Sequence, residues 1–254
     1  MIDPILIVKN VSIHFGGITA LDRVSFDVPT GSIVGLIGPN GAGKTTMFNC
    51  LSRSYTPSEG EIIFNGKPLL SLPAHAIAGA GIGRTFQNLA TFGELSVLDN
   101  VCIGAHARYP SNILRDIFSP SGLRNEKQIQ EQAMRMVEYL GLGPVMNKRV
   151  ADLPFGTQKR VEMARSLAME PQLLLLDEPA CGLNHLEVDE LCELIRNVQK
   201  DMSLTVLLVE HHMNMVMAIC EKIVVLNFGR MLANGTPEEI RNSSAVIAAY
   251  LGES

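Results

Sequence analysis

The strongest pattern along the chain is a set of short apolar runs, each as long as one strand. Residues 33–37, 173–176 and 205–209 are apolar at almost every position. A strand that is apolar on both faces is typical of a parallel sheet covered on both sides by helices. The pattern therefore predicts an α/β fold with a mainly parallel core sheet.

Other segments alternate between apolar and polar positions, which indicates antiparallel strands. Residues 5–28 keep strand parity around Gly16 and Gly17, which predicts a hairpin that turns at this glycine pair. Residues 61–67 contain the hairpin signal Asn-Gly, and residues 223–233 form a last expected hairpin. Antiparallel strands are therefore expected on both sides of the first apolar run in the sequence.

Apolar positions at helical spacing dominate residues 96–152 and predict helices there. Gly141 is expected to cap one of them, whereas residues 105–124 are irregular and receive no assignment. The helix that Gly141 caps is expected to have an apolar face formed by Ile129, Ala133, Val137 and Leu140. Other helices are expected over residues 74–83 and 245–251, and two more are expected to begin at Met47 and Met213. Three further helices are expected to begin at cap residues: Thr157, Asn184 in a capping box with Glu187, and Thr236.

The composition excludes several classes of protein. The chain has 254 residues, 46% hydrophobic and 19% charged, which suits one large folded domain or two small ones. A net charge of −5 argues against binding through bulk positive charge, so no nucleic-acid partner is expected. No apolar run approaches the ~20 residues needed to cross a bilayer, and the first residues lack the pattern of a secretory signal. The five scattered cysteines are expected to be buried free thiols of a cytosolic protein.

One stretch, residues 38–46, carries the clearest chemistry. It lies between an expected strand and an expected helix, and it has the order of a P-loop: Gly, four residues, Gly, Lys, Thr. Backbone N–H groups of such a loop line a concavity for phosphate, and the helix N-terminus adds positive potential. Lys44 is expected to reach the β- and γ-phosphates, Thr45 to hold Mg²⁺ and Thr46 to lie toward the α-phosphate. The nucleotide-binding candidates are Gly38, Pro39, Asn40, Gly41, Ala42, Gly43, Lys44, Thr45 and Thr46.

Polar side chains follow two of the expected buried strands. Asp177 and Glu178 come directly after residues 173–176, where open α/β sheets bind their ligands. Asp177 suits the shell of Mg²⁺, and Glu178 suits a group that orients or deprotonates an attacking water. His211 stands just past the strand over residues 205–209, where an imidazole could contact a γ-phosphate.

Four further candidate residues are ambiguous from the sequence alone. Phe15 precedes a turn and either stacks on an adenine or only packs. Gln87 follows a short β-like stretch and has the surroundings of an ordinary surface loop. Gly156 and Thr157 mark a helix N-terminus, which is an element that favours phosphate.

The order of these motifs resembles the nucleotide-binding subunit of ATP-binding cassette (ABC) transporters over essentially the whole chain. The resemblance implies that ATP and Mg²⁺ are the ligands. It makes Phe15 the adenine-stacking aromatic, residues 38–46 the Walker A loop, and Gln87 the Q-loop contact to Mg²⁺ and water. It makes residues 153–158 the signature motif, Asp177 the Walker B aspartate, Glu178 the catalytic glutamate and His211 the switch histidine.

The departures from the common ABC motifs indicate which subgroup of ABC transporters the chain resembles. Pro154 replaces the usual signature serine, so backbone N–H groups near Gly156 and the Thr157 hydroxyl are expected to substitute. Asn184 stands where many cassettes have Asp. The stretches Pro-Phe-Gly-Thr-Gln-Lys-Arg and Val-Glu-His are similar to the ATPases of branched-chain amino-acid importers. Urea and lipopolysaccharide transporters share much of this pattern, and a soluble cassette acting on DNA or ribosomes is a remote alternative.

The resemblance also implies an organisation and a set of partners. A single ABC ATPase domain is expected over residues 1–254, as a P-loop core with an antiparallel β subdomain and a helical subdomain. The core and β subdomain are expected at 1–86 and 160–254, and the helical subdomain at 87–159. The partners are a second ATPase subunit, transmembrane permease subunits and, indirectly, a solute-binding protein. The chain is expected to lie peripherally on the cytoplasmic face of the cell membrane, with residues 105–124 as partner contact.

Overall fold

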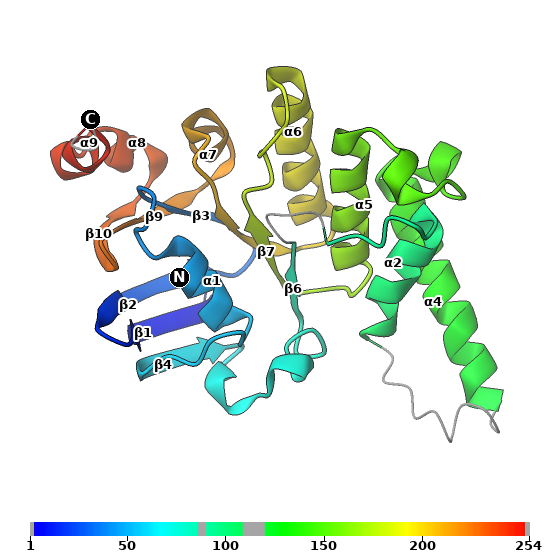
Figure 1. Ribbon diagram of the computed structural model, residues 1–254, viewed down its shortest axis with the longest axis horizontal. Coiled ribbons are helices and arrows are strands. Elements are labelled where there is room, and N and C mark those ends of the chain that lie inside the picture. Colours follow the sequence, from blue (N-terminus) through cyan, green and yellow to red (C-terminus); the bar gives the residue numbers. More distant parts are fainter. Residues whose placement is uncertain (1–2, 86–89, 109–119, 252–254) are drawn as a thin grey trace. The chain divides into compact units, whose positions relative to one another are not determined.

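The chain folds into two units, of which the first is formed by two separate stretches of the sequence. The computed structural model describes residues 3–85, 90–108 and 120–251. The first unit comprises Met1–Ile77 and Leu175–Ser254, and the second comprises Ala78–Leu174. Figure 1 colours the chain along the sequence and labels the elements of each unit where there is room.

The first unit is built on a mixed, mostly parallel sheet. Its strands follow the order β10-β9-β3-β8-β7, and β3 pairs in parallel with both β8 and β9. Every residue of β3, β7 and β8 is buried, so the prediction of a mainly parallel core sheet is confirmed. The strands are β3 (Ile33–Ile37), β7 (Leu173–Asp177), β8 (Thr205–Val209), β9 (Lys222–Asn227) and β10 (Arg230–Gly235).

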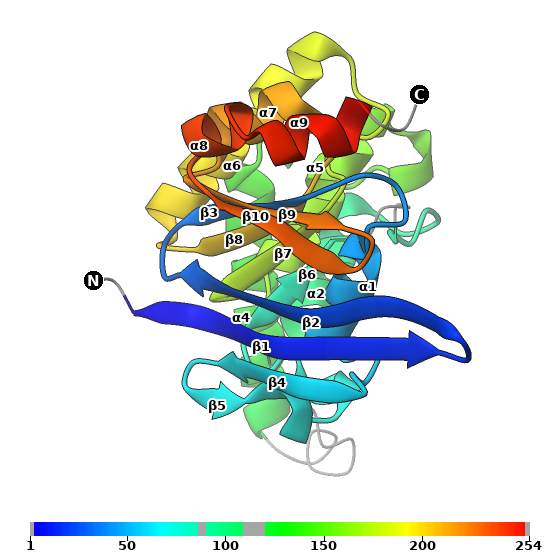
Figure 2. The same ribbon diagram turned by 90° about the vertical axis from the view of Figure 1, so that its left-hand side faces the viewer.

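Helices cover both faces of this sheet, which explains why its strands are apolar on both sides. The helices α7, α8 and α9 lie on one face, and α1 lies on the other, toward a second sheet (Figure 2). The expected capping box at Asn184 is present, and the expected cap at Thr236 also takes the form of a capping box. The helices of this unit are α1 (Lys44–Leu51), α6 (His185–Asp201), α7 (Met213–Ile219), α8 (Pro237–Arg241) and α9 (Ser244–Leu251).

The second sheet of this unit is antiparallel, with strand order β2-β1-β4-β5. Its first hairpin turns at Gly16 and Gly17, as predicted. Where a helix was expected over residues 74–83, a 3₁₀ turn, η2 (Ala74–Ala76), forms instead, and a strand begins at Ile82. The strands are β1 (Pro4–Phe15), β2 (Ile18–Pro29), β4 (Glu59–Phe64) and β5 (Lys67–Pro68), followed by η1 (Leu69–Ser71).

The second unit packs three helices beside one short strand. The apolar face predicted for α4 (Pro120–Tyr139) is buried at all four positions, Ile129, Ala133, Val137 and the adjoining Leu140. Gly141 follows this helix with φ +68°, as a capping glycine does. Residues 140–152 were expected to be helical but contain only two 3₁₀ turns. Residues 109–119, within the unassigned stretch, lie outside the described residues. The elements are β6 (Ile82–Arg84), α2 (Val97–His106), α4 (Pro120–Tyr139), η3 (Gly143–Val145), η4 (Val150–Asp152) and α5 (Phe155–Leu167).

The cysteines are free, but the expectation that all of them are buried is wrong. Cys181 is exposed and Cys102 is half-buried. Burial raises the pKa of the Cys50 thiol to about 11 and that of Cys220 to about 12. Both thiols are therefore protonated and unreactive near neutral pH.

Two hairpin turns share one geometry but have different surroundings. Asn65 and Gly66 join β4 to β5, and Phe228 and Gly229 join β9 to β10; all four have positive φ, as in type I′ turns. A Cβ at Gly66 would meet nothing within 4 Å. A Cβ at Gly229 would lie 2.7 Å from the Ala20 carbonyl oxygen of β2. The second turn is therefore pressed against its neighbour, and the first is not.

This difference predicts unequal effects of the same substitution. Gly66→Ala should lower the free energy of unfolding by about 1–2 kcal/mol, the cost of left-handed backbone for a residue with a Cβ. Gly229→Ala should cost roughly 1–3 kcal/mol more, because backbone must also shift. Urea denaturation of both variants measures the difference. Equal losses would contradict the close approach.

Candidate nucleotide-binding site

The P-loop leaves the core sheet at the end of β3 and runs into α1. That helix begins at Lys44, three residues earlier than expected, because Gly43 with φ +102° serves as its N-cap. Lys44, Thr45 and Thr46 therefore form its first turn, whose N–H groups have no partner within the helix. Gly38, with φ +149°, comes so close to β9 that a Cβ there would overlap the Leu226 carbonyl oxygen.

The Lys44 side chain folds over the loop that precedes it. Its Nζ donates to the carbonyl oxygens of Gly38 at 2.6 Å and Pro39 at 2.8 Å, and only 8% of the residue is exposed. The ammonium is thus held where the loop curves, beside the first turn of α1. The neighbouring Thr45 is an exposed residue.

The β9–β10 turn is hydrogen-bonded to the P-loop. The Gly229 N–H donates to the Ala42 carbonyl oxygen at 3.1 Å, and the Gly229 carbonyl oxygen accepts from the Asp22 N–H at 2.8 Å. Arg230 adds an ion pair to Asp22, at 2.6 Å. These contacts join the P-loop, β2 and β10.

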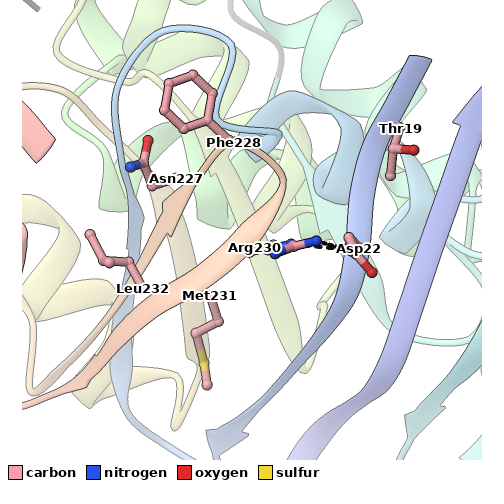
Figure 3. Close-up of a pocket in the computed structure, with 7 residues that line it drawn as sticks. All are labelled: Thr19, Asp22, Asn227, Phe228, Arg230, Met231 and Leu232. Carbon is pink, nitrogen blue, oxygen red and sulfur yellow. Dashed lines mark hydrogen bonds and ion pairs between the residues drawn. The ribbon is translucent and has the colours of Figure 1, made fainter.

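A cavity of about 580 Å³ opens beside the same turn, with Thr19 and Asp22 on one side and Phe228 and Arg230 on the other (Figure 3). The Arg230–Asp22 ion pair crosses it. Its lining includes no residue of the P-loop and none of the predicted catalytic side chains. It is therefore distinct from the candidate site.

The acidic pair follows β7 at the same edge of the sheet. Asp177 is the last residue of β7 and is buried. Glu178 has φ +47°, a conformation that is uncommon for a residue with a Cβ, and its N–H donates to the Val209 carbonyl oxygen of β8 at 2.9 Å. Parallel strands bring their carboxyl ends together, which is why the residues after β7 and β8 meet.

The imidazole that follows β8 lies near the Glu178 carboxylate and equally near the carboxylate of Glu210. His211 Nδ1 lies 3.8 Å from Glu178 Oε2. The His211 side chain is 59% exposed and that of Glu178 is 19% exposed, so both are accessible to solvent. The structure thus brings together two residues that are separated by 33 positions in the sequence.

One residue of this edge carries no role in the sequence analysis. Glu210 is the residue between β8 and His211 and is fully buried. Its carboxylate accepts N–H groups from Ala180 at 2.7 Å, His211 at 2.8 Å and His212 at 2.9 Å. The available signal was a carboxylate directly after a buried strand, the same signal that singled out Asp177.

Phe15 ends β1 and is 44% exposed. Its ring meets Tyr55 edge to face, with centroids 5.1 Å apart and planes at 69°. The contact leaves part of the Phe15 ring accessible. No spacing in the sequence indicates Tyr55, because the two residues are 40 positions apart.

The signature residues belong to the second unit, and their predicted helix start is wrong. Thr157 is not an N-cap; α5 begins at Phe155, and Pro154 is the N-cap without a side-chain hydrogen bond. The proline ring fixes φ of residue 154 at −56°, and its ψ of 149° is extended rather than helical, so the helix starts immediately after it. Gly156 and Thr157 therefore lie inside the first turn. Gln87 lies outside the described residues.

The residues present fit a nucleotide with Mg²⁺. Within the described ranges, no cluster of three or more His, Cys, Asp or Glu side chains could hold a metal alone. Mg²⁺ bound with nucleotide needs few protein ligands, because phosphates and water complete its shell. Thr45 and Asp177 are suitable ligands.

Among the described helices, none is long and apolar enough to span a membrane.

Comparisons with known proteins agree with this geometry. The family profile described as ABC transporter matches residues 21–181, and the one described as branched-chain amino acid ATP-binding cassette transporter matches residues 230–254. The high-affinity branched-chain amino acid transport ATP-binding protein BraF of Pseudomonas aeruginosa is 43% identical, over 98% of both chains. LivG of Escherichia coli, which has the same description, is 42% identical over the full length of both.

Solved structures show the same fold. A crystal structure of the ADP conformation of an ATP-binding cassette matches with a TM-score of 0.86 and 27% identity, over 98% of this chain and 99% of that one. A dimeric cassette in a post-hydrolysis state, bound to ADP and Pi, matches with a TM-score of 0.76 and 25% identity, over 91% and 98%. The chain therefore belongs to the ABC transporter family, among the ATP-binding proteins that include BraF and LivG.

Proposed function

We propose that this chain binds and hydrolyses ATP as the motor subunit of an importer for branched-chain amino acids. The observation that carries the hydrolytic role is the Glu178–His211 pair, which lies 3.8 Å apart at the sheet edge from which the P-loop also leaves. The substrate class is supported by the 42–43% identity to BraF and LivG over essentially the whole chain.

The P-loop binds the phosphates. Backbone N–H groups of the loop and of the first turn of α1 donate to phosphate oxygens, and the helix N-terminus adds positive potential. When the nucleotide binds, the Lys44 ammonium gives up its hydrogen bonds to two loop carbonyls and donates to β- and γ-phosphate oxygens instead. The phosphate oxygens are negatively charged, so these hydrogen bonds are stronger than those to the carbonyls. Its burial keeps the ammonium at the loop, so little ordering is needed when the nucleotide binds.

The metal ligands are Thr45, Asp177 and Gln87. Mg²⁺, when bound, neutralises charge on the β- and γ-phosphate oxygens. Asp177 is buried at the end of β7 and Thr45 is exposed on α1, so each supplies an oxygen from a rigid element.

Glu178 and His211 act on the attacking water. The Glu178 carboxylate accepts a hydrogen bond from the water and aims its oxygen at the γ-phosphorus, opposite the bond to ADP. The new P–O bond forms as the bond to the leaving ADP oxygen breaks, and the water proton passes toward the carboxylate. His211 donates to a γ-phosphate oxygen and helps to hold the water in line.

A second cassette completes the site. The first turn of α5, with Gly156 and Thr157, supplies donors to the γ-phosphate held by a facing cassette, which is a second copy or a related chain. The solved cassette that is dimeric supports the pairing of two cassettes. Permease subunits dock beside Gln87 and the helices at 87–159, with residues 105–124 as partner contact. A solute-binding protein delivers the amino acid, and the chain lies on the cytoplasmic face of the membrane.

Replacing Glu178 tests the hydrolytic role. Glu178→Gln keeps the size of the side chain but removes its charge, so kcat for Mg-ATP should fall by roughly 10²–10⁴-fold. ATP affinity, measured by titration, should change little, whereas Lys44→Ala should lose it. Full turnover by Glu178→Gln would exclude this residue as the group that activates water.

Replacing Phe15 tests adenine stacking. Phe15→Ala should weaken ATP binding by roughly 5–30-fold, because stacking of a base on an aromatic ring contributes roughly 1–2 kcal/mol. Phe15→Tyr keeps the ring and is the matched control, with affinity close to that of the unsubstituted chain. An unchanged dissociation constant for Phe15→Ala would mean that Phe15 only packs against Tyr55.

Capture of partners tests the transport role. Tagged Glu178→Gln protein with Mg-ATP, incubated with native membranes, should recover permease chains, a related ATPase and a solute-binding protein, identified by mass spectrometry. The amino acid bound by the last protein identifies the substrate. Lys44→Ala is the control that lacks ATP. Recovery of lipid-export subunits, or of ribosomal proteins without membrane proteins, would contradict the proposal.

A further inference from the structure

Glu210 is a fully buried carboxylate to which the mechanism above gives no task. It is 0% exposed, so it cannot touch a nucleotide or the attacking water. A carboxylate in such a place is costly unless hydrogen bonds replace its hydration. Three backbone N–H groups provide them, at 2.7, 2.8 and 2.9 Å.

The three donors come from two separate loops. Ala180, two residues after Glu178, donates to Oε1, whereas His211 and His212 donate to Oε2. Each oxygen of one carboxylate therefore holds one loop. The first loop carries the proposed base Glu178, and the second carries its proposed partner His211.

The backbone at Glu178 depends on such support. Its φ of +47° is unfavourable for a residue with a Cβ, and such a conformation persists only where surrounding contacts impose it. Two hydrogen bonds flank it: the Glu178 N–H donates to the Val209 carbonyl oxygen, and the Ala180 N–H donates to Glu210. Both acceptors belong to consecutive residues at the end of β8. The orientation of Glu178 is thus set from the strand that also presents His211.

We propose that Glu210 is a positioning residue for ATP hydrolysis, which holds the Glu178 turn and the His211 loop in one fixed geometry. This inference rests on the proposed function of Glu178 and His211. An ionised carboxylate suits the task because both oxygens accept hydrogen bonds. A glutamine amide has only one acceptor oxygen, so its NH₂ group would oppose either Ala180 N–H or the pair of N–H groups from the histidines.

The test compares two substitutions of the same chemistry in the full chain. Glu210→Gln should lower kcat for Mg-ATP by roughly tenfold or more, while KM changes by less than about threefold, because the phosphate-binding loop is untouched. Glu187→Gln is the matched control: its carboxylate also accepts a backbone N–H, from Asn184, but at the exposed start of α6. That variant should keep kcat within about twofold.

Stability is measured alongside, so that a misfolded variant is not mistaken for a mispositioned site. Rates are taken per folded molecule, with the folded fraction from thermal denaturation. A kcat within about twofold of the unsubstituted chain, or a parallel rise in KM, would overturn the proposal. If Glu210→Gln does not fold, Glu210→Asp decides: it keeps the charge but is one methylene shorter, and an unchanged kcat would again overturn the proposal.

Hydrogen exchange on the unsubstituted chain gives a measurement that needs no variant. The Ala180, His211 and His212 amides should exchange slowly, and rapid exchange at Ala180 would overturn the bridge between the loops. Failure of the proposed function would give different results. In that case the unsubstituted chain would not hydrolyse ATP, or the Glu178→Gln chain would hydrolyse it fully.

Discussion

The candidate site depends on the parallel pairing of fully buried strands. Because β3 and β8 run in the same direction, the P-loop and the Glu210–His211 segment leave the sheet at one edge. The Glu178 N–H bonds to the last residue of β8, so the end of β7 lies at that edge as well. The apolar faces of these strands are satisfied by packing on both sides, which leaves only their ends for polar chemistry.

Backbone groups at this edge are satisfied by charged side chains. The Lys44 ammonium donates to two P-loop carbonyls, and the Glu210 carboxylate accepts three N–H groups. Loops at a strand end cannot use ladder hydrogen bonds, and buried backbone groups without partners are costly. The same charges therefore stabilise the loops and fix the shape of the site before any ligand binds, which lowers the ordering cost of binding.

The unusual signature sequence has a local structural consequence. Pro154 takes the N-cap position of α5, so Gly156 and Thr157 lie within its first turn rather than before it. First-turn N–H groups have no partner within the helix. A signature without serine can thus still present several backbone donors, and the proposed contact to a facing nucleotide depends on the helix start more than on one hydroxyl.

The sequence by itself determined the strands, the hairpins, the capping boxes and the P-loop, because these follow from local periodicity and from turn or cap residues. The tertiary structure decided where α1 and α5 begin and which side chains meet. The contact of Phe15 with Tyr55 and the left-handed backbone of Glu178 depend on neighbours distant in sequence. The three N–H groups that surround Glu210 come from two loops that only the closed sheet brings together. No spacing along a chain encodes such a meeting, since it is the packing of whole strands that sets it.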